Sequence, residues 1–156
     1  MIKIFKMRKL LLTILIVCLC SCEDNSKKIS AAVVSARIEA SSIGVDIMKK
    51  GGNAFDAMVA TDLALSVCYP NAGNIGGGGF LVYRTKTGEV GSLDFREKAP
   101  SKANEKMFIN PEGFVTKKKS TIGGLSVGVP GTVAGLFEVH SKLCSLPFED
   151  LIQPAI

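Results

Sequence analysis

The chain has 156 residues, which suffice for one domain of ordinary size, and its 47% hydrophobic and 21% charged residues exclude an intrinsically disordered protein. Of its formal net charge of +5, four charges belong to basic residues within the first nine positions, a stretch without an acidic residue. The rest is nearly neutral and does not indicate nucleic-acid binding, and the lysine run at 117–119 is predicted to be a solvated loop.

The N-terminus has the pattern of an export signal. The basic stretch MIKIFKMRK precedes the apolar LLLTILIVCLCS, which has secretory length and is short for a membrane span. Residues 19–22, Leu-Cys-Ser-Cys, resemble a bacterial lipobox, in which Cys22 would become the lipidated first residue of the mature protein. We therefore expect a lipoprotein signal peptide at 1–21, a polar tether at 22–30 and export to the periplasm or cell envelope, with a lipid anchor in the membrane. An ordinary signal peptide that contains cysteines is the alternative.

Few residues remain for cross-links or metal ligands. Cys68 and Cys144 lie beyond the signal, and export would permit a disulfide between them, but two free buried thiols are the simpler expectation. His140 is the only histidine, and its helical spacing from Leu136 and Leu143 indicates a packing or surface role. No metal site is predicted.

Hydrophobic periodicity and helix-ending residues define the first elements. The apolar, β-branched run AAVVSA at 31–36 predicts a strand. Apolar residues at three- and four-residue spacing predict a helix over 37–50, which the glycine pair at 51–52 can end. Asn53 is a good N-cap for a second helix over 54–68, which is almost wholly apolar and must be covered on most of its surface.

The period then changes to that of strands. Segments 80–84 and 90–96 predict an antiparallel hairpin with Gly88 in its turn. A third helix is predicted from near Pro130, a favoured first-turn residue, to about 143–145, and the beginning of another follows it. Helices followed by a hairpin and further helices predict the α+β class, with helices layered on antiparallel strands.

Four consecutive glycines at 76–79, within YPNAGNIGGGGFLVY, indicate that the backbone there approaches something closely. A dinucleotide fingerprint needs glycines at i, i+2 and i+5, but here the last position falls on Leu81 or Val82. A P-loop is excluded because Phe80 follows the run, which also opens a strand instead of a helix. Close packing against protein and a surface for a substrate both remain open.

Four motifs occur in order along the chain: GVDIMKKGGNAFDAMVAT at 44–61, NAGNIGGGGF at 71–80, LDFREKAPSKA at 93–103 and GVPGTVAG at 128–135. Together they resemble the N-terminal part of the gamma-glutamyltranspeptidase family, over about residues 32–156. The resemblance implies an α+β fold that is the N-terminal portion of an αββα sandwich of the N-terminal-nucleophile hydrolase type, and an incomplete one.

Members of this family are made as precursors that cleave themselves into a large and a small subunit. The new N-terminal threonine of the small subunit attacks the γ-glutamyl amide of glutathione or a similar compound. Water, an amino acid or a peptide then accepts the γ-glutamyl group. The threonine's own α-amino group is the base, so the resemblance implies neither a cofactor nor a metal.

The resemblance places the family's α-carboxylate-binding arginine at Arg96, in the DFRE motif. A guanidinium fork matches a planar carboxylate with two parallel hydrogen bonds. An ion pair with Asp94 or Glu97 is the alternative interpretation of this residue. The glycine run and the turn at 128–135 correspond to scaffold near the site, not to catalytic groups.

The small subunit, with the nucleophile and the oxyanion hole, has no counterpart in these residues, so no catalytic residue is assigned. Residues 31–156 are expected to be a truncated large-subunit domain whose partners are γ-glutamyl compounds and the missing small-subunit portion, and to be inactive alone. Two other functions stay open. One is a non-catalytic, lipid-anchored remnant or binding module, and the other is a related enzyme of the cephalosporin-acylase type.

Overall fold

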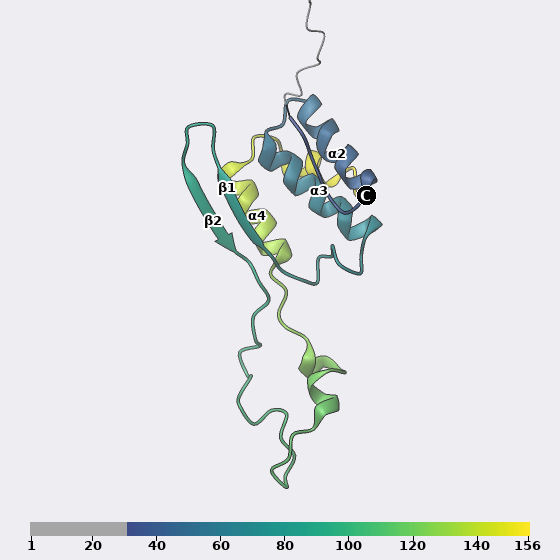
Figure 1. Ribbon diagram of the computed structural model, residues 1–156, viewed down its shortest axis with the longest axis vertical. Helices are drawn as coiled ribbons and strands as arrows, with labels where there is room; N and C mark the ends of the chain where they lie inside the picture. The colour runs from purple at the N-terminus through teal and green to yellow at the C-terminus, as the bar shows by residue number, and fades with distance from the viewer. Residues whose placement is uncertain (1–30) are drawn as a thin grey trace, which may run out of the picture. The chain divides into compact units, whose positions relative to one another are not determined.

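The computed structural model describes residues 31–156 (Figure 1). The signal peptide, the tether and Cys22 lie outside the described residues, so those expectations remain predictions. Within the described range, no helix combines the length and apolar character needed to cross a membrane. The elements are α2 (Ile38–Lys49), α3 (Ala54–Cys68), β1 (Phe80–Arg84), β2 (Val90–Asp94), the 3₁₀ turns η1 (Lys117–Ser120) and η2 (Gly124–Ser126), α4 (Thr132–Leu143) and α5 (Phe148–Ile152).

Helices α2 and α3 form an antiparallel pair joined by a tight turn (Figure 1). Gly51, at φ +99°, follows α2 in the left-handed conformation that glycine adopts without strain. Asn53 accepts hydrogen bonds from the N–H groups of Phe55 and Asp56, while the Asp56 carboxylate accepts one from the N–H of Asn53. This capping box fixes the start of α3 at Ala54, directly after the predicted N-cap.

The prediction of a strand at 31–36 is wrong. Residues 31–35 have no regular secondary structure, and the described residues contain a single sheet, in which β1 pairs only with β2. A strand requires a partner for its N–H and C=O groups, and the apolar run meets helices instead. Val33 packs at Gly44 of α2, where an added Cβ would lie 2.9 Å from its Cγ1, while Val34 is 92% exposed.

The predicted hairpin is confirmed. β1 and β2 pair antiparallel with Leu81 opposite Leu93, and Gly88 at φ +91° lies in the turn. One face, which includes Leu81 and Leu93, is half-buried against the core, whereas Phe80 and Val82 on the other face are exposed. The regular strand ends at Asp94, two residues before the predicted end at 96.

The core lies between the helices and the inner face of the hairpin. Helix α4 begins at Thr132, two residues after the predicted start, and runs alongside the hairpin (Figure 1). Its Leu136 and Val139 are buried against side chains of α2, α3 and α5. The buried core cluster consists of Ile47, Val59, Ala60, Leu63, Leu136, Val139 and Leu151. His140 has the expected packing role, because its ring nitrogen hydrogen-bonds the Leu146 carbonyl at 2.9 Å and its ring meets Phe148 edge-on.

The α+β class is thus confirmed. Only a two-stranded sheet is present in residues 31–156, which agrees with a portion of a larger layered fold.

Candidate functional site

Three of the sequence motifs meet beside the hairpin. The carbonyl oxygen of Gly77 accepts hydrogen bonds from the N–H groups of Gly131 at 2.8 Å and Thr132 at 3.1 Å. Helix α4 has no side-chain cap, so this carbonyl satisfies two N–H groups that would otherwise have no partner at its N-terminus. The glycine run is therefore joined directly to the turn at 128–131.

The glycines allow two pieces of backbone to touch. A Cβ added to Gly78 would lie 2.7 Å from both the Glu97 nitrogen and the Phe95 oxygen, and one added to Gly79 would lie 2.8 Å from the Phe95 ring. A Cβ at Gly131 would collide with the Phe95 carbonyl oxygen. Close packing of protein against protein, one of the two alternatives left open by the sequence, thus explains the last two glycines of the run.

The segment that follows β2 is tied to the entrance of α4. Lys98 and Val129 exchange two backbone hydrogen bonds, of 3.1 and 2.8 Å. Because the glycine run contacts the same segment from another side, the main chain from Phe95 to Lys98 is held by several interactions although it lies outside a regular strand.

Arg96 lies within this segment and is exposed, as are Glu97 and Lys98. Its backbone N–H donates to Asp94 Oδ1 at 3.0 Å, and its guanidinium carbon lies 5.6 Å from the centre of the Phe80 ring. The guanidinium makes no ion pair or hydrogen bond with any residue between 31 and 156, so the alternative pairing with Asp94 or Glu97 is not observed. Its donors are available to a ligand.

A small cleft with a volume of ≈ 300 Å³ adjoins Arg96. Its charged lining carries both signs, with Arg96 and Lys98 contributed by the segment after β2, Asp94 by β2 itself and Glu138 by α4. The opposite wall is formed by Gly131 and its neighbours. Such a cleft provides cationic donors for a carboxylate and carboxylates for an ammonium group.

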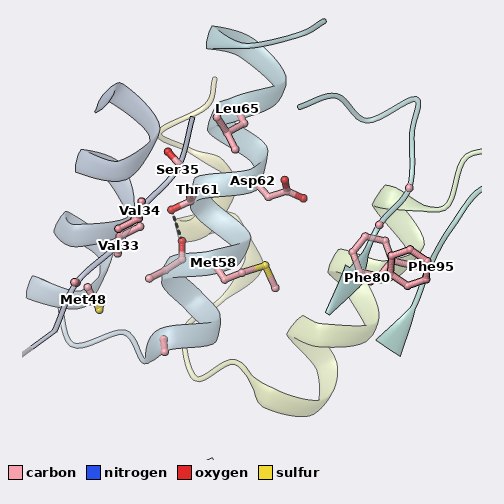
Figure 2. Close-up of a pocket in the computed structure, with 15 residues that line it drawn as sticks. Val33, Val34, Ser35, Met48, Met58, Thr61, Asp62, Leu65, Phe80 and Phe95 are labelled. Atoms are coloured by element: carbon pink, nitrogen blue, oxygen red, sulfur yellow. Dashed lines mark hydrogen bonds between the residues drawn. The ribbon is translucent and has the colours of Figure 1, made fainter. Parts of the chain in front are cut away.

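A larger cleft of ≈ 500 Å³ is lined by residues of α3, by Gly78 and Gly79 of the glycine run, and by Phe80 and Phe95 (Figure 2). Met58 and Asp62 project from α3 toward the side where Phe80 and Phe95 lie (Figure 2). Most of the lining is apolar, and burial raises the pKa of the Asp62 carboxyl. Phe80 lines this cleft and is also the aromatic neighbour of Arg96.

Cys68 and Cys144 are both free and half-buried, so the disulfide left open by the sequence does not form in this structure. Burial and the neighbouring Asp56 carboxylate raise the pKa of the Cys144 thiol to about 12. No group of three or more metal-ligating side chains occurs in the part of the chain that the structure describes.

Sequence reasoning identified Arg96 but missed its neighbour Phe80. The signal was present, because pairing 80–84 antiparallel with 90–94 across a five-residue turn puts Phe80 opposite Asp94, two residues before Arg96. Alternation within the strand predicted at 90–96 places Asp94 and Arg96 on one face but does not identify the residue opposite them on the partner strand.

Comparison with known proteins supports the family resemblance that the motifs indicate. A family model described as gamma-glutamyltranspeptidase matches residues 40–156. The glutathione hydrolase proenzyme of Escherichia coli K12 is 47% identical over 123 residues, which are 79% of this chain and 21% of that protein. The corresponding proenzyme of Pseudomonas sp. strain A14 is 50% identical over 124 residues, which are 80% of this chain and 22% of that protein. The chain thus spans about a fifth of the length of these relatives.

Solved structures show the same similarity. The gamma-glutamyltranspeptidase of Helicobacter pylori has a TM-score of 0.77 at 48% identity, over 80% of this chain and 36% of that one. The enzyme of Pseudomonas nitroreducens, complexed with L-DON, has a TM-score of 0.76 at 44% identity, over 80% of this chain and 37% of that one. A cephalosporin acylase of Bacillus halodurans is more distant, with a TM-score of 0.58 at 31% identity, over 74% of this chain and 21% of that one. The chain belongs to the gamma-glutamyltranspeptidase family.

Proposed function

We propose that these residues form the donor-binding part of a gamma-glutamyltransferase and glutathione hydrolase, and that Arg96 binds the α-carboxylate of the γ-glutamyl group. The observation that carries the proposal is the state of Arg96. Its main chain is fixed by Asp94 and the glycine run, whereas its guanidinium is exposed and free of ion pairs among residues 31–156. A planar fork of donors held in this way is suited to receive a carboxylate in two parallel hydrogen bonds.

The reaction we assign to the complete protein is acyl transfer. A threonine hydroxyl oxygen attacks the γ-carbonyl carbon, the C–N bond breaks, and the amine leaves with a proton passed on by the threonine α-amino group. Water or the amino group of an amino acid or peptide then attacks the resulting ester and releases the threonine. Arg96 of this chain would hold the donor's α-carboxylate while this chemistry takes place at the γ-carbon of the donor. We assign no cofactor to the reaction.

In the family that the motifs resemble, this threonine belongs to the small-subunit portion, and the chain spans only about a fifth of the length of its relatives. We therefore expect the 156-residue chain to have no hydrolase or transferase activity by itself. The purified chain should release no p-nitroaniline from γ-glutamyl-p-nitroanilide, and turnover by it would contradict the assignment of the nucleophile.

A chimaera provides the positive test. Residues 32–156 would replace the matching segment of the Escherichia coli relative, which is 47% identical over the aligned region. Self-cleavage and release of p-nitroaniline by the chimaera would support the proposal. Within it, Arg96→Met should raise KM for the donor by about 10- to 100-fold, because the substrate loses charge-assisted hydrogen bonds. An unchanged KM would refute the role of Arg96.

A second candidate is an acylase of different acyl specificity. It is favoured by the similarity to the Bacillus halodurans cephalosporin acylase, at 31% identity and a TM-score of 0.58. The same chimaera distinguishes the two, because an acylase would remove the acyl group of a cephalosporin faster than it cleaves a γ-glutamyl anilide. A non-catalytic binding module would instead show saturable binding of glutathione to the chain alone.

We further propose that the protein is exported and held at a membrane through a lipid on Cys22. The basic and apolar stretches that precede this cysteine, and the small residues next to it, support the proposal. Expression in a bacterium fed a labelled fatty acid should give a labelled chain, and Cys22→Ser should abolish the label. Labelling that persists in the Cys22→Ser variant would reject this anchor.

A further inference from the structure

We propose that Phe80 is a positioning residue for donor binding, because its ring supports the face of the Arg96 guanidinium and leaves the N–H edge free for a carboxylate. This inference rests on the proposed function of Arg96 and assigns a role to Phe80, the last residue of the NAGNIGGGGF motif. Phe80 begins β1 and Arg96 lies two residues after the end of β2, and the register of the hairpin brings the two side chains together.

The backbone hydrogen bonds on both sides favour the contact between Phe80 and Arg96. Phe80 pairs with Asp94 in the antiparallel register, and the Phe95 N–H donates to the Gly79 carbonyl at 3.0 Å. Asp94 Oδ1 in turn accepts the N–H of Arg96 at 3.0 Å. The main chain on both sides of the contact is therefore held by hydrogen bonds, so the ring and the guanidinium start from fixed positions.

An aromatic neighbour suits the task better than a carboxylate would. The Arg96 guanidinium carbon is 5.6 Å from the Phe80 ring centre, within the range of cation–π attraction. A carboxylate at this place would occupy the N–H donors and compete with the substrate, whereas a ring attracts the cation without accepting those hydrogen bonds. The ring also restricts the rotamers of a long side chain, so less freedom is lost when the ligand binds.

The core gives Phe80 no other role. Its side chain is 65% exposed, and it does not belong to the buried cluster or to the half-buried side chains packed against it. Val82 lies on the same outward face of β1 and is 77% exposed, but it has no contact with Arg96 among the described interactions. Val82 therefore provides a matched control on the same strand and face.

The contact can be measured on the full chain as it exists. The Nε–Hε signal of Arg96 in the ¹⁵N-labelled protein should be shifted upfield by the ring current of Phe80. Phe80→Leu should move the signal to the position of a solvated arginine, Phe80→Tyr should restore it, and Val82→Ala should leave it in place. A wild-type signal already at the solvated position, or one that Phe80→Leu does not move, would overturn the proposal.

The consequence for binding is tested in the chimaera with the Escherichia coli relative. Phe80→Leu should raise KM for γ-glutamyl-p-nitroanilide by about two- to five-fold at unchanged kcat, the size expected for an exposed cation–π contact. Phe80→Tyr should restore the wild-type KM, and Val82→Ala should not change it. Equal increases in the Phe80→Leu and Val82→Ala variants would show a general loss of structure and reject a positioning role.

The two proposals fail in different ways. If Arg96→Met leaves KM unchanged while Phe80→Leu still moves the Arg96 signal, the carboxylate-binding function is wrong and so is a role for Phe80 in donor binding, although their contact remains. If Arg96→Met raises KM but Phe80→Leu changes neither the signal nor KM, Arg96 binds the donor without the ring and only the positioning role is rejected.

Discussion

Ser145 donates two hydrogen bonds to Asp56 across 89 positions of sequence, from its Oγ to Oδ2 at 2.6 Å and from its N–H to Oδ1 at 3.0 Å. The N–H groups of Leu146 and Asn53 donate to the same carboxylate, at 3.0 and 2.7 Å. Asp56 is fully buried, so these four bonds replace the water that the charge has lost. The start of α3 is thereby joined to the loop after α4, and the two helices that flank the site are fixed to each other.

Ser145→Ala should lower the free energy of unfolding by about 1.5 kcal/mol, because it removes a short hydrogen bond to a buried carboxylate. The measurement is urea unfolding followed by circular dichroism. Ser141→Ala is the matched control, since the Ser141 hydroxyl is exposed and donates only to the Glu138 carbonyl within α4. An equal loss in both variants would show that the bond to Asp56 contributes nothing specific.

Stability should fall in acid because of Asp56. Burial alone would raise its pKa, but the hydrogen bonds from Ser145, Leu146 and Asn53 outweigh it and hold the pKa of Asp56 below its ordinary value of 3.8. A depressed native pKa means that the stabilisation is fully present above pH 3.8 and is lost as the pH falls below that value. Asp56→Asn should therefore have a flatter stability curve below about pH 4 than the wild type. Urea titrations at several pH values give the free energy of unfolding of each protein. Parallel pH dependences for Asp56→Asn and the wild type would contradict this prediction.

The N-cap of α3 and the hairpin could be predicted because their signals are local. Asn53 and Asp56 are three residues apart, and Gly88 lies in a short turn between two runs of strand-forming residues. The strand expected at 31–36 failed for the opposite reason. Its existence depended on a distant partner strand, and the run meets α2 at Gly44 instead.

The site was predictable in part for the same reason. Arg96 lies in a motif and was found by resemblance, but its ring contact depends on the register between two strands. The role of Asp56 outside its own helix was not predicted, because Ser145 is brought to it only by the packing of α4 on α3. Contacts made by side chains distant in sequence thus account for most of what the sequence did not reveal.

Cys144 should react slowly with thiol reagents in the folded chain. Burial and the adjacent Asp56 carboxylate raise the pKa of its thiol to about 12, so almost no thiolate exists near neutral pH. Iodoacetamide labelling at about pH 8, resolved by peptide mass spectrometry, should leave Cys144 unmodified when cysteine in a short model peptide is fully modified. Unfolding in urea should make Cys144 as reactive as the cysteine of the model peptide. Equal rates in the folded and unfolded chains would contradict the burial of this thiol.

Gly78→Ala should destabilise the fold and displace Arg96. The new Cβ would lie 2.7 Å from the Glu97 nitrogen and the Phe95 oxygen and 2.8 Å from the Arg96 Cα, and these backbone atoms cannot move away as a side chain could. Neither Gly78 nor Gly76 has a positive φ, so the difference between them is purely one of space. We expect Gly78→Ala to lower the free energy of unfolding by about 1–3 kcal/mol, the usual cost of overpacking.

Gly76→Ala is the control for this prediction within the same glycine run. Its added Cβ would meet only Asn74 Oδ1, at 3.3 Å, and the end of that side chain can rotate away. Its effect on the free energy of unfolding should stay within about 0.5 kcal/mol. In the labelled chain, Gly78→Ala but not Gly76→Ala should move the Arg96 Nε–Hε signal, because only the former displaces the Arg96 backbone. If both alanines cost the same and neither moves the signal, the glycines are not required for the approach of the two backbone segments.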